Sequence, residues 1–188
     1  LIDVQRQKVI DSVLIPKSYV GIKFTADERF LYASGGNDNW ILKYAVSNQK
    51  LILKDSLKLG NRWPNKISPT GLDIDDARHL LYVVTKDNNS LYVLNLVTKK
   101  IKDSLQLPGE AYTCLLSNNK KKLYISCWGC DKLLVVDIAT NSIEKEIPVG
   151  DNPNDFCLSK NGKYLFVCNS NDNSVSVIDV VRELVIET

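Results

Sequence analysis

A short pattern of residues recurs along the chain at a nearly constant spacing, and this repeat strongly limits the folds that are available. Leu81–Val84, Leu123–Ser126 and Leu165–Cys168 follow one another at intervals of 42 residues, and Leu31–Ser34 lies 50 residues before the first of them. Each copy is a short run of apolar, aromatic and β-branched residues. A period in the forties built from short strands is typical of β-repeat arrays such as propellers.

The last copy shows the local structure that each repeat predicts. Residues 164–168 and 175–179 are two apolar runs, and residues 169–174, which are rich in Asn, Asp and Ser, separate them. Runs of about five β-branched and aromatic residues broken by a polar turn favour an antiparallel hairpin over a helix. The repeats therefore predict strand pairs throughout.

Four such strands fit into each repeat, so we expect an all-β fold, a β-propeller built of four-stranded antiparallel blades. Residues 1–188 would form one β-propeller domain or a fragment of one. The expected units are the end of a blade at 1–15 and whole blades at 16–59, 60–107, 108–149 and 150–188. This makes about four whole blades and a leading partial blade.

The charge of the chain is nearly balanced, with 24 basic and 22 acidic residues and a net charge of +2. The basic residues are scattered, whereas a nucleic-acid groove needs clustered Lys and Arg, so we expect no nucleic-acid partner. No apolar run approaches the roughly 20 residues of a membrane span. The chain opens without Met and within the repeat pattern, and no signal segment is present in it, so we expect that any such segment has been removed.

The five cysteines do not have the dense spacing of a disulfide scaffold. Cys127 and Cys130 form a C-x-x-C in a turn, which is compatible with a disulfide, a thiol pair or half of a zinc site. His79 is the only histidine, which disfavours zinc, and an ordinary turn is the favoured interpretation. The other three, which lie in predicted strands, are expected to act as small apolar residues: Cys114, Cys157 and Cys168.

A short polar side chain closes the third strand in four copies of the repeat. Asp137 and Asp179 are 42 residues apart, and Asn95 and Asp3 occupy the same register. A side-chain oxygen there can accept hydrogen bonds from the N–H groups of the following turn. We interpret all four as structural residues and not as catalytic ones.

Two segments, 138–150 and 170–179, resemble the YVTN family of β-propeller repeats. Residues 82–85 and 166–169 are imperfect copies of its name-giving tetrad. Relatives of this repeat mostly have about seven blades, so the resemblance implies that the chain is part of a larger propeller. It also implies an extracytoplasmic location, periplasmic or at the cell surface. The turn at residues 34–39 is similar to that in the N-terminal propeller of bacterial proteins that carry a phosphoesterase domain, and no part of that domain lies within the chain.

In a propeller, the loops between blades and the turns between the second and third strands meet on one face around the central channel. We therefore expect a ligand on this loop face, with large aromatic residues as its anchors. Packing between blades is an equally good explanation of the aromatic residues. The candidate binding residues are Tyr19, Arg62, Trp63, Asn65, Tyr112, Trp128, Asn154 and Asn169, and the wider set adds Lys17, Ser18, Asn37, Asp38, Lys86, Asp87, Glu110, Asp131, Asn152 and Asn171.

Three functions fit this pattern. The first is a non-enzymatic binding or scaffolding propeller that presents the loop face to a protein, glycan or small molecule, without a cofactor. The second is the recognition module of a longer phosphoesterase-containing protein. The third is a lactonase-like hydrolase with a metal at the channel mouth, for which oxygen ligands would come from Glu110, Asp131, Asn154, Asp155 and Asn169. We assign no catalytic or metal-binding residue, since His79 is expected on the opposite face and no nucleophile motif occurs.

Overall fold

The computed structural model describes residues 1–61 and 64–188, so two of the candidate residues, Arg62 and Trp63, lie outside the described residues. It consists of four four-stranded antiparallel sheets and one two-stranded hairpin. The hairpin is β1 (Ile2–Asp3) and β2 (Lys8–Val9). The four sheets are named blades I to IV in chain order. Blade I consists of β3 (Ile22–Phe24), β4 (Phe30–Ser34), β5 (Trp40–Ser47) and β6 (Lys50–Lys58), and blade II of β7 (Pro69–Asp75), β8 (Leu80–Thr85), β9 (Ser90–Asn95) and β10 (Lys100–Gln106). Blade III consists of β11 (Ala111–Leu116), β12 (Lys122–Cys127), β13 (Lys132–Asp137) and β14 (Ser142–Pro148), and blade IV of β15 (Pro153–Leu158), β16 (Tyr164–Asn169), β17 (Ser174–Asp179) and β18 (Leu184–Glu187).

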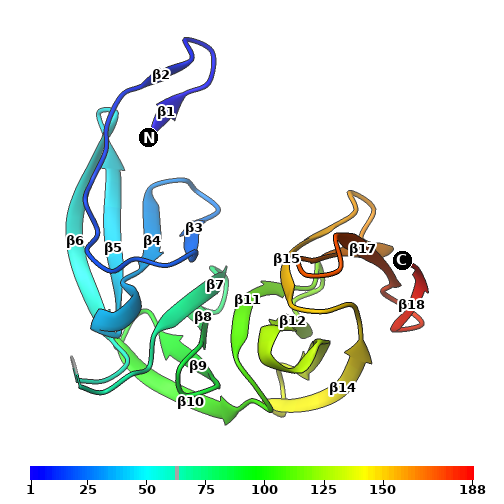
Figure 1. Cartoon of the computed structure of the whole chain (residues 1–188). Helices are drawn as coiled ribbons and strands as arrows, with labels where there is room; N and C mark the ends of the chain where they lie inside the picture. Colours follow the sequence, from blue (N-terminus) through cyan, green and yellow to red (C-terminus); the bar gives the residue numbers. More distant parts are fainter. Residues whose placement is uncertain (62–63) are drawn as a thin grey trace.

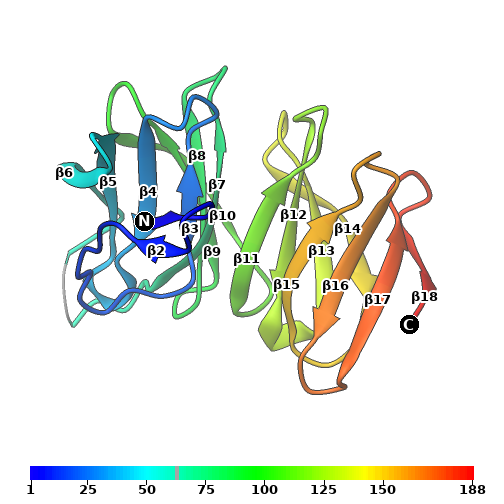
Figure 2. The ribbon, with the colours of Figure 1, turned by 90° about the horizontal axis from the view of Figure 1, so that it is seen from above.

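The four blades follow one another around an arc (Figure 1). The first strand of each blade, β3, β7, β11 or β15, lies on the inner side of the arc, and the last strand, β6, β10, β14 or β18, lies on the outer side. Viewed from above, the blades stand side by side with their strands roughly aligned (Figure 2). The expected all-β propeller architecture is confirmed, with four whole blades and a leading hairpin.

The cores lie between blades, because the strands in the middle of the arc have two apolar faces. Successive side chains of a strand point to opposite sides of the sheet. In β8, Leu81 and Val83 pack toward blade I, while Tyr82 and Val84 pack toward blade III. The apolar core is thus divided into three clusters, one at each interface between neighbouring blades. This division explains why the second strand of the repeat has no polar face.

The innermost strands approach one another closely, and two glycines make this possible. A Cβ atom on Gly21 would lie 2.0 Å from the Thr70 carbonyl oxygen, and one on Gly71 would lie 2.3 Å from the Cα atom of Thr113. The Thr70 hydroxyl lies 3.0 Å from the carbonyl oxygen of Ala111, in the next blade. The backbone of each inner strand therefore packs directly against its neighbour.

A buried carboxylate joins three of the blades near the axis. Asp73 on β7 forms an ion pair with Lys23 of blade I, with 2.8 Å between Oδ1 and Nζ. Its Oδ2 accepts a hydrogen bond of 2.7 Å from the backbone N–H of Leu116 in blade III. A buried charge is tolerated when it is paired and hydrogen-bonded in this way. Asp73 thus fixes the relative positions of β3, β7 and β11.

The predicted turn-capping role of the residue that closes the third strand is confirmed at all four positions. Oδ1 of Asp137 accepts the N–H of Thr140, and Oδ1 of Asp179 accepts the N–H of Arg182. Asn95 and Asp3 make the equivalent bonds in their own turns. Donation by Thr140 to Asp137 lowers the pKa of this carboxyl.

Two of the three strand cysteines do not behave as buried apolar residues. Cys114 is buried as expected, but Cys157 and Cys168 are exposed. In β16, Leu165 and Val167 face blade III, so Cys168, which is one residue further along, faces the other side of blade IV. Blade IV ends the arc, and no further blade among the described residues covers that side.

Within the described parts of the chain, no helix is long and apolar enough to cross a membrane.

The titration of Tyr32 gives a pH-dependent test of the interface between blades I and II. Burial, and then the charges of Asp76 and Asp55, raise the pKa of Tyr32 from 10.0 to about 12. The folded state therefore prefers the protonated phenol, and this contribution to stability is complete below pH 10 and is lost as the pH rises to 12. Chemical unfolding measured between pH 9 and 12 should show a smaller loss of stability in Tyr32→Phe than in the wild type. The exposed Tyr164→Phe should match the wild type, and an equal slope in Tyr32→Phe would contradict the packing described here.

Candidate binding site on the loop face

The loops of blades I and II enclose a hollow of about 470 Å³ at one end of the inner strands. It lies where the loop that leads into β3 meets the loop that leads into β7 and the β8–β9 turn. Its volume falls in the usual range for small-molecule sites, although it is open and lined by residues with polar or charged side-chain groups. The lining residues are Lys17, Ser18, Tyr19, Asn37, Lys66, Ser68, Thr70, Lys86 and Asp87.

Asn39 holds the loop that forms one wall of this hollow. Its side chain is fully buried. Its Nδ2 group donates to the carbonyl oxygens of Asn61 and Asn65, and its Oδ1 accepts the N–H groups of Ile67 and Ser68, both at 3.0 Å. Because Asn39 adopts a left-handed φ of 59° at the end of the β4–β5 turn, its side chain is directed at the next blade's loop. One residue thus holds Asn61 and residues 65–68 of this loop.

Ser68 connects this loop to the turns on either side. Its hydroxyl lies 2.6 Å from Oδ2 of Asp87 and 3.0 Å from Oδ1 of Asn37. A hydroxyl has one proton, so it donates to one of these two acceptors at a time. Blades I and II therefore share a polar contact at the floor of the hollow.

Two of the predicted aromatic residues meet although they belong to blades I and III. The rings of Tyr19 and Tyr112 form an edge-to-face pair, with their centroids 6.0 Å apart and their planes at 68°. Such pairs are favourable beyond the area that they bury. Tyr19 remains 46% exposed, so its ring has a free side at the edge of the hollow.

Trp128 contacts Lys86 at the boundary between blades II and III. The Lys86 ammonium is 4.9 Å from the centroid of the Trp128 ring and 3.8 Å from Oε2 of Glu110. The indole Nε1 is buried without a hydrogen-bond acceptor among the described residues. The cation–π contact and the ion pair together direct Lys86 toward blade III.

A disulfide bond fixes the turn that carries Trp128. Cys127 and Cys130 are bonded to each other, with their Cα atoms 5.5 Å apart, which decides among the three states that the sequence allowed. They enclose the short helical turn η2 (Trp128–Cys130). Gly129 in this turn donates its N–H to the carbonyl oxygen of Glu110. The disulfide closes the β12–β13 turn on itself, and the Gly129 hydrogen bond joins this turn to the loop that precedes β11.

The structure separates the predicted site residues into two groups. Tyr19 lines the hollow, while Tyr112 contacts Tyr19 and Trp128 contacts the lining residue Lys86. Asn154 and Asn169 lie in blade IV, where Asn169 donates to the hydroxyls of Ser174 and Ser176. Asn65 is exposed and contributes its backbone carbonyl oxygen to Asn39. Sequence reasoning missed three lining residues: Lys66 and Ser68 on the loop into β7, and Thr70 in β7 itself.

The carboxylates that were considered for a metal are engaged separately. Glu110 pairs with Lys86, Oδ1 of Asp131 accepts the Asn152 N–H, and Oδ1 of Asp155 accepts the Phe156 N–H. In the described ranges, no three His, Cys, Asp or Glu side chains come together as a group that could hold a metal ion.

Removal of the Asn39 side chain should loosen the loop wall. Asn39→Gly keeps the left-handed backbone accessible but deletes four hydrogen bonds at a buried site, so we expect a loss of about 2–4 kcal/mol of unfolding free energy. Urea unfolding measures this loss. The control is Asn173→Gly, at the equivalent position of the β16–β17 turn with a φ of 51°, where the exposed side chain makes no hydrogen bond to any described residue. Equal losses in both variants would contradict the role given to Asn39.

The disulfide can be tested by counting the free thiols of the chain. Of the five cysteines, three are free in the structure, so a thiol reagent should detect three thiols per unreduced, denatured chain and five after reduction. Because the bond closes a very short loop, the double variant Cys127→Ala/Cys130→Ala should lose only about 2 kcal/mol of stability. Five thiols in the unreduced protein would show that the bond is absent.

Comparison with known proteins supports the architecture. Residues 111–184, which span most of blades III and IV, match the model of the seven-bladed β-propeller lactonase family. Antigen Lp49 of Leptospira interrogans is 30% identical over 137 residues, which are 69% of this chain and 29% of the antigen.

Solved structures show the same fold at low sequence identity. Hydrazine synthase of Kuenenia stuttgartiensis superposes with a TM-score of 0.80 at 19% identity, over 93% of this chain and 49% of that one. A protein of unknown function from Desulfotomaculum acetoxidans gives 0.77 at 14% identity, over 95% and 59%. A candidate 6-phosphogluconolactonase from Bacteroides uniformis gives 0.74 at 16% identity, over 91% and 53%.

The chain thus spans between 29% and 59% of the length of these proteins. The family match and the fold together identify it as a β-propeller chain with four four-stranded blades in its described residues.

Proposed function

We propose that this chain is a non-enzymatic binding propeller whose loop face takes a polar, hydroxyl-rich ligand such as a glycan. The observation that carries this proposal is the hollow on the loop face, where ammonium, hydroxyl and carboxylate groups surround an opening edged by the exposed ring of Tyr19. Hydrogen-bond donors and acceptors beside an aromatic ring suit a ligand with many hydroxyls and some acidic groups.

The surroundings of the hollow favour recognition because they are preorganised. Its walls come from neighbouring blades and are held by Asn39, by the Ser68 hydroxyl and by the pairing of Lys86 with Glu110. A site that is already ordered loses less conformational entropy on binding. The candidate residues Tyr19, Asn65, Tyr112 and Trp128 belong to this face, and Arg62 and Trp63 occupy the same loop in the sequence.

A lactonase-like hydrolase is the second candidate, because the family match covers blades III and IV. On this hypothesis the site would lie closer to Asn154 and Asn169 than to the hollow of blades I and II. The Oδ1 atoms of these two residues are buried without donors in the described part of the chain, so they have acceptor capacity to spare.

The wider context is also part of the proposal. The relatives are longer than this chain, and the sequence resemblance suggests the recognition module of a phosphoesterase-containing protein. An extracytoplasmic location is supported by the Cys127–Cys130 disulfide, since such bonds persist in oxidising compartments. We retain the blade boundaries 16–59, 60–107, 108–149 and 150–188 as the proposed units.

Binding at the hollow can be tested by calorimetric titration with hyaluronan tetrasaccharide, which is acidic, and with cellotetraose, which is neutral. Tyr19→Ala should weaken binding of the preferred saccharide about 10-fold, because an anchor ring is lost. It should lower the melting temperature only slightly, because Tyr19 is 46% exposed and loses one edge-to-face contact with Tyr112. Tyr164→Ala on blade IV, which is also exposed, should leave the affinity unchanged.

The enzymatic alternative is tested separately by following the hydrolysis of 6-phosphogluconolactone with and without Mg²⁺, Ca²⁺ or Zn²⁺. No rate above the spontaneous one is expected. Metal-dependent turnover that Asn169→Ala abolishes would favour the hydrolase, and the absence of saccharide binding would refute the glycan proposal.

A further inference from the structure

The inferred site lies away from the loop face, in the grooves between the outer parts of the blades, where the repeats can be compared position by position. The turn between the third and fourth strands ends in a residue with left-handed φ: Lys99, Asn141 and Glu183 in blades II, III and IV. The side chain of each of these residues contacts the preceding blade. Lys99 pairs with Asp55, Asn141 donates to the carbonyl oxygen of Ser104, and Glu183 pairs with Lys122. This position therefore decides how each groove is closed.

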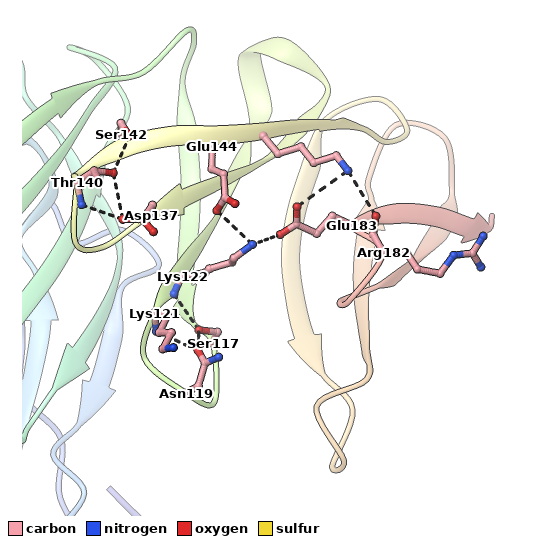
Figure 3. Close-up of polar contacts among 11 residues, drawn as sticks. Ser117, Asn119, Lys121, Lys122, Asp137, Thr140, Ser142, Glu144, Arg182 and Glu183 are labelled. Carbon is pink, nitrogen blue, oxygen red and sulfur yellow. Dashed lines mark hydrogen bonds and ion pairs between the residues drawn. The ribbon is translucent and has the colours of Figure 1, made fainter.

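The groove between blades III and IV is closed by the protein's own carboxylates (Figure 3). Lys122 forms ion pairs with Glu144 of its own blade, at 3.1 Å, and with Glu183 of blade IV. Glu183 is only 13% exposed and also lies 4.0 Å from Lys145. The hydrogen bond to Glu183 raises the pKa of Lys122, which keeps the ammonium charged.

The groove between blades II and III has the opposite arrangement of charges. Glu144 is the extra residue of a β-bulge in β14, and Lys102 is the extra residue of the corresponding bulge in β10. A bulge directs its extra side chain in a defined direction, so a cation replaces an anion at the same position. The neutral Asn141 of blade III also stands at the position that Glu183 occupies in blade IV, one repeat of 42 residues later. This groove thus lacks both of the carboxylates that close its neighbour.

The result is an open groove of about 610 Å³. The ammonium groups of Lys102, Lys120 and Lys121 have no carboxylate partner among residues 1–61 and 64–188. The three lysines line the groove together with Tyr82, Asp103 and Asp137.

The carboxylates near this groove are already engaged. Asp75 is paired with Arg78 at 3.0 Å. Asp103 accepts the N–H of Ser104, and Asp137 accepts both the N–H and the hydroxyl of Thr140. Hydrogen bonding leaves Asp103 and Asp137 charged, so the three lysines face two aspartates and the groove keeps one excess positive charge.

Tyr82 supplies an independent sign of a ligand. It lines the groove, is only 2% exposed, and its hydroxyl has no hydrogen-bond partner within the described chain. Buried polar groups nearly always have a partner, so an unpaired hydroxyl needs an explanation. Burial raises the pKa of Tyr82 to about 12, and the group is therefore a neutral donor at physiological pH.

We propose that the groove between blades II and III binds a small organic anion, a phosphate or carboxylate carried on a compact apolar body. The anionic group takes the place that the Glu183 carboxylate occupies one blade further on, where it meets Lys102, Lys120 and Lys121 and accepts a hydrogen bond from the Tyr82 hydroxyl. The apolar body lies against Leu80, Val93 and Ile138, which line the same groove.

Calorimetry at low ionic strength tests this proposal with three probes: phenyl phosphate, benzoate and inorganic phosphate. Phenyl phosphate or benzoate should bind, and inorganic phosphate should bind at least 10-fold more weakly because it has no apolar body. The double variant Lys120→Ala/Lys121→Ala should weaken binding 10-fold or more, since charge-assisted contacts are lost. Lys163→Ala is the matched control, because Lys163 occupies the register of Lys121 in blade IV and is absent from the groove.

Two further variants separate binding from folding. Lys102→Glu places a carboxylate at the bulge, as in blade III, and should abolish binding of the anion while the melting temperature is retained. Tyr82→Phe should weaken binding about 10-fold without lowering the stability of the unliganded protein, because the hydroxyl that it removes has no partner. The proposal fails if none of the three probes binds, if inorganic phosphate binds as tightly as phenyl phosphate, or if Lys163→Ala weakens binding as much as the double variant.

Discussion

Apolar packing between neighbouring blades is the interaction on which the structure depends. A single four-stranded sheet cannot bury both of its faces, so Leu81 and Val83 need blade I while Tyr82 and Val84 need blade III. Stability in such an array comes from contacts between nearest neighbours. The consequence is visible at the ends of the arc, where the apolar side chains of Ile22 in blade I and Val175 in blade IV are exposed.

Polar contacts give this packing its geometry. Apolar surfaces can slide, but a buried carboxylate such as Asp73 requires its two partners in blades I and III at defined positions. Asn39 acts in the same way on the loop before β7, and Lys86 joins blade II to Glu110 of blade III. The loop face is therefore ordered by contacts between blades, which allows it to present a preformed site.

The differences between repeats are as informative as their similarity. Positions that keep one residue type, such as the side-chain acceptors in the third turn, serve the common scaffold. Positions that change charge between otherwise equivalent grooves, such as Lys102 and Glu144, indicate that neighbouring grooves have different roles. The loop hollow and the groove between blades II and III lie at opposite turns of the blades, and they can thus serve different ligands.

The sequence alone determined the strands, their order and the turn caps, because alternation and turn chemistry act over a few residues and repeat every 42. It also predicted that Tyr19, Tyr112 and Trp128 belong to one face. Only the tertiary structure decided that Tyr19 touches Tyr112 across two blades, that Asp73 binds Lys23, and that Cys168 faces outward. These outcomes depend on how far side chains reach across interfaces and on which blades have neighbours, and a periodic pattern carries neither kind of information.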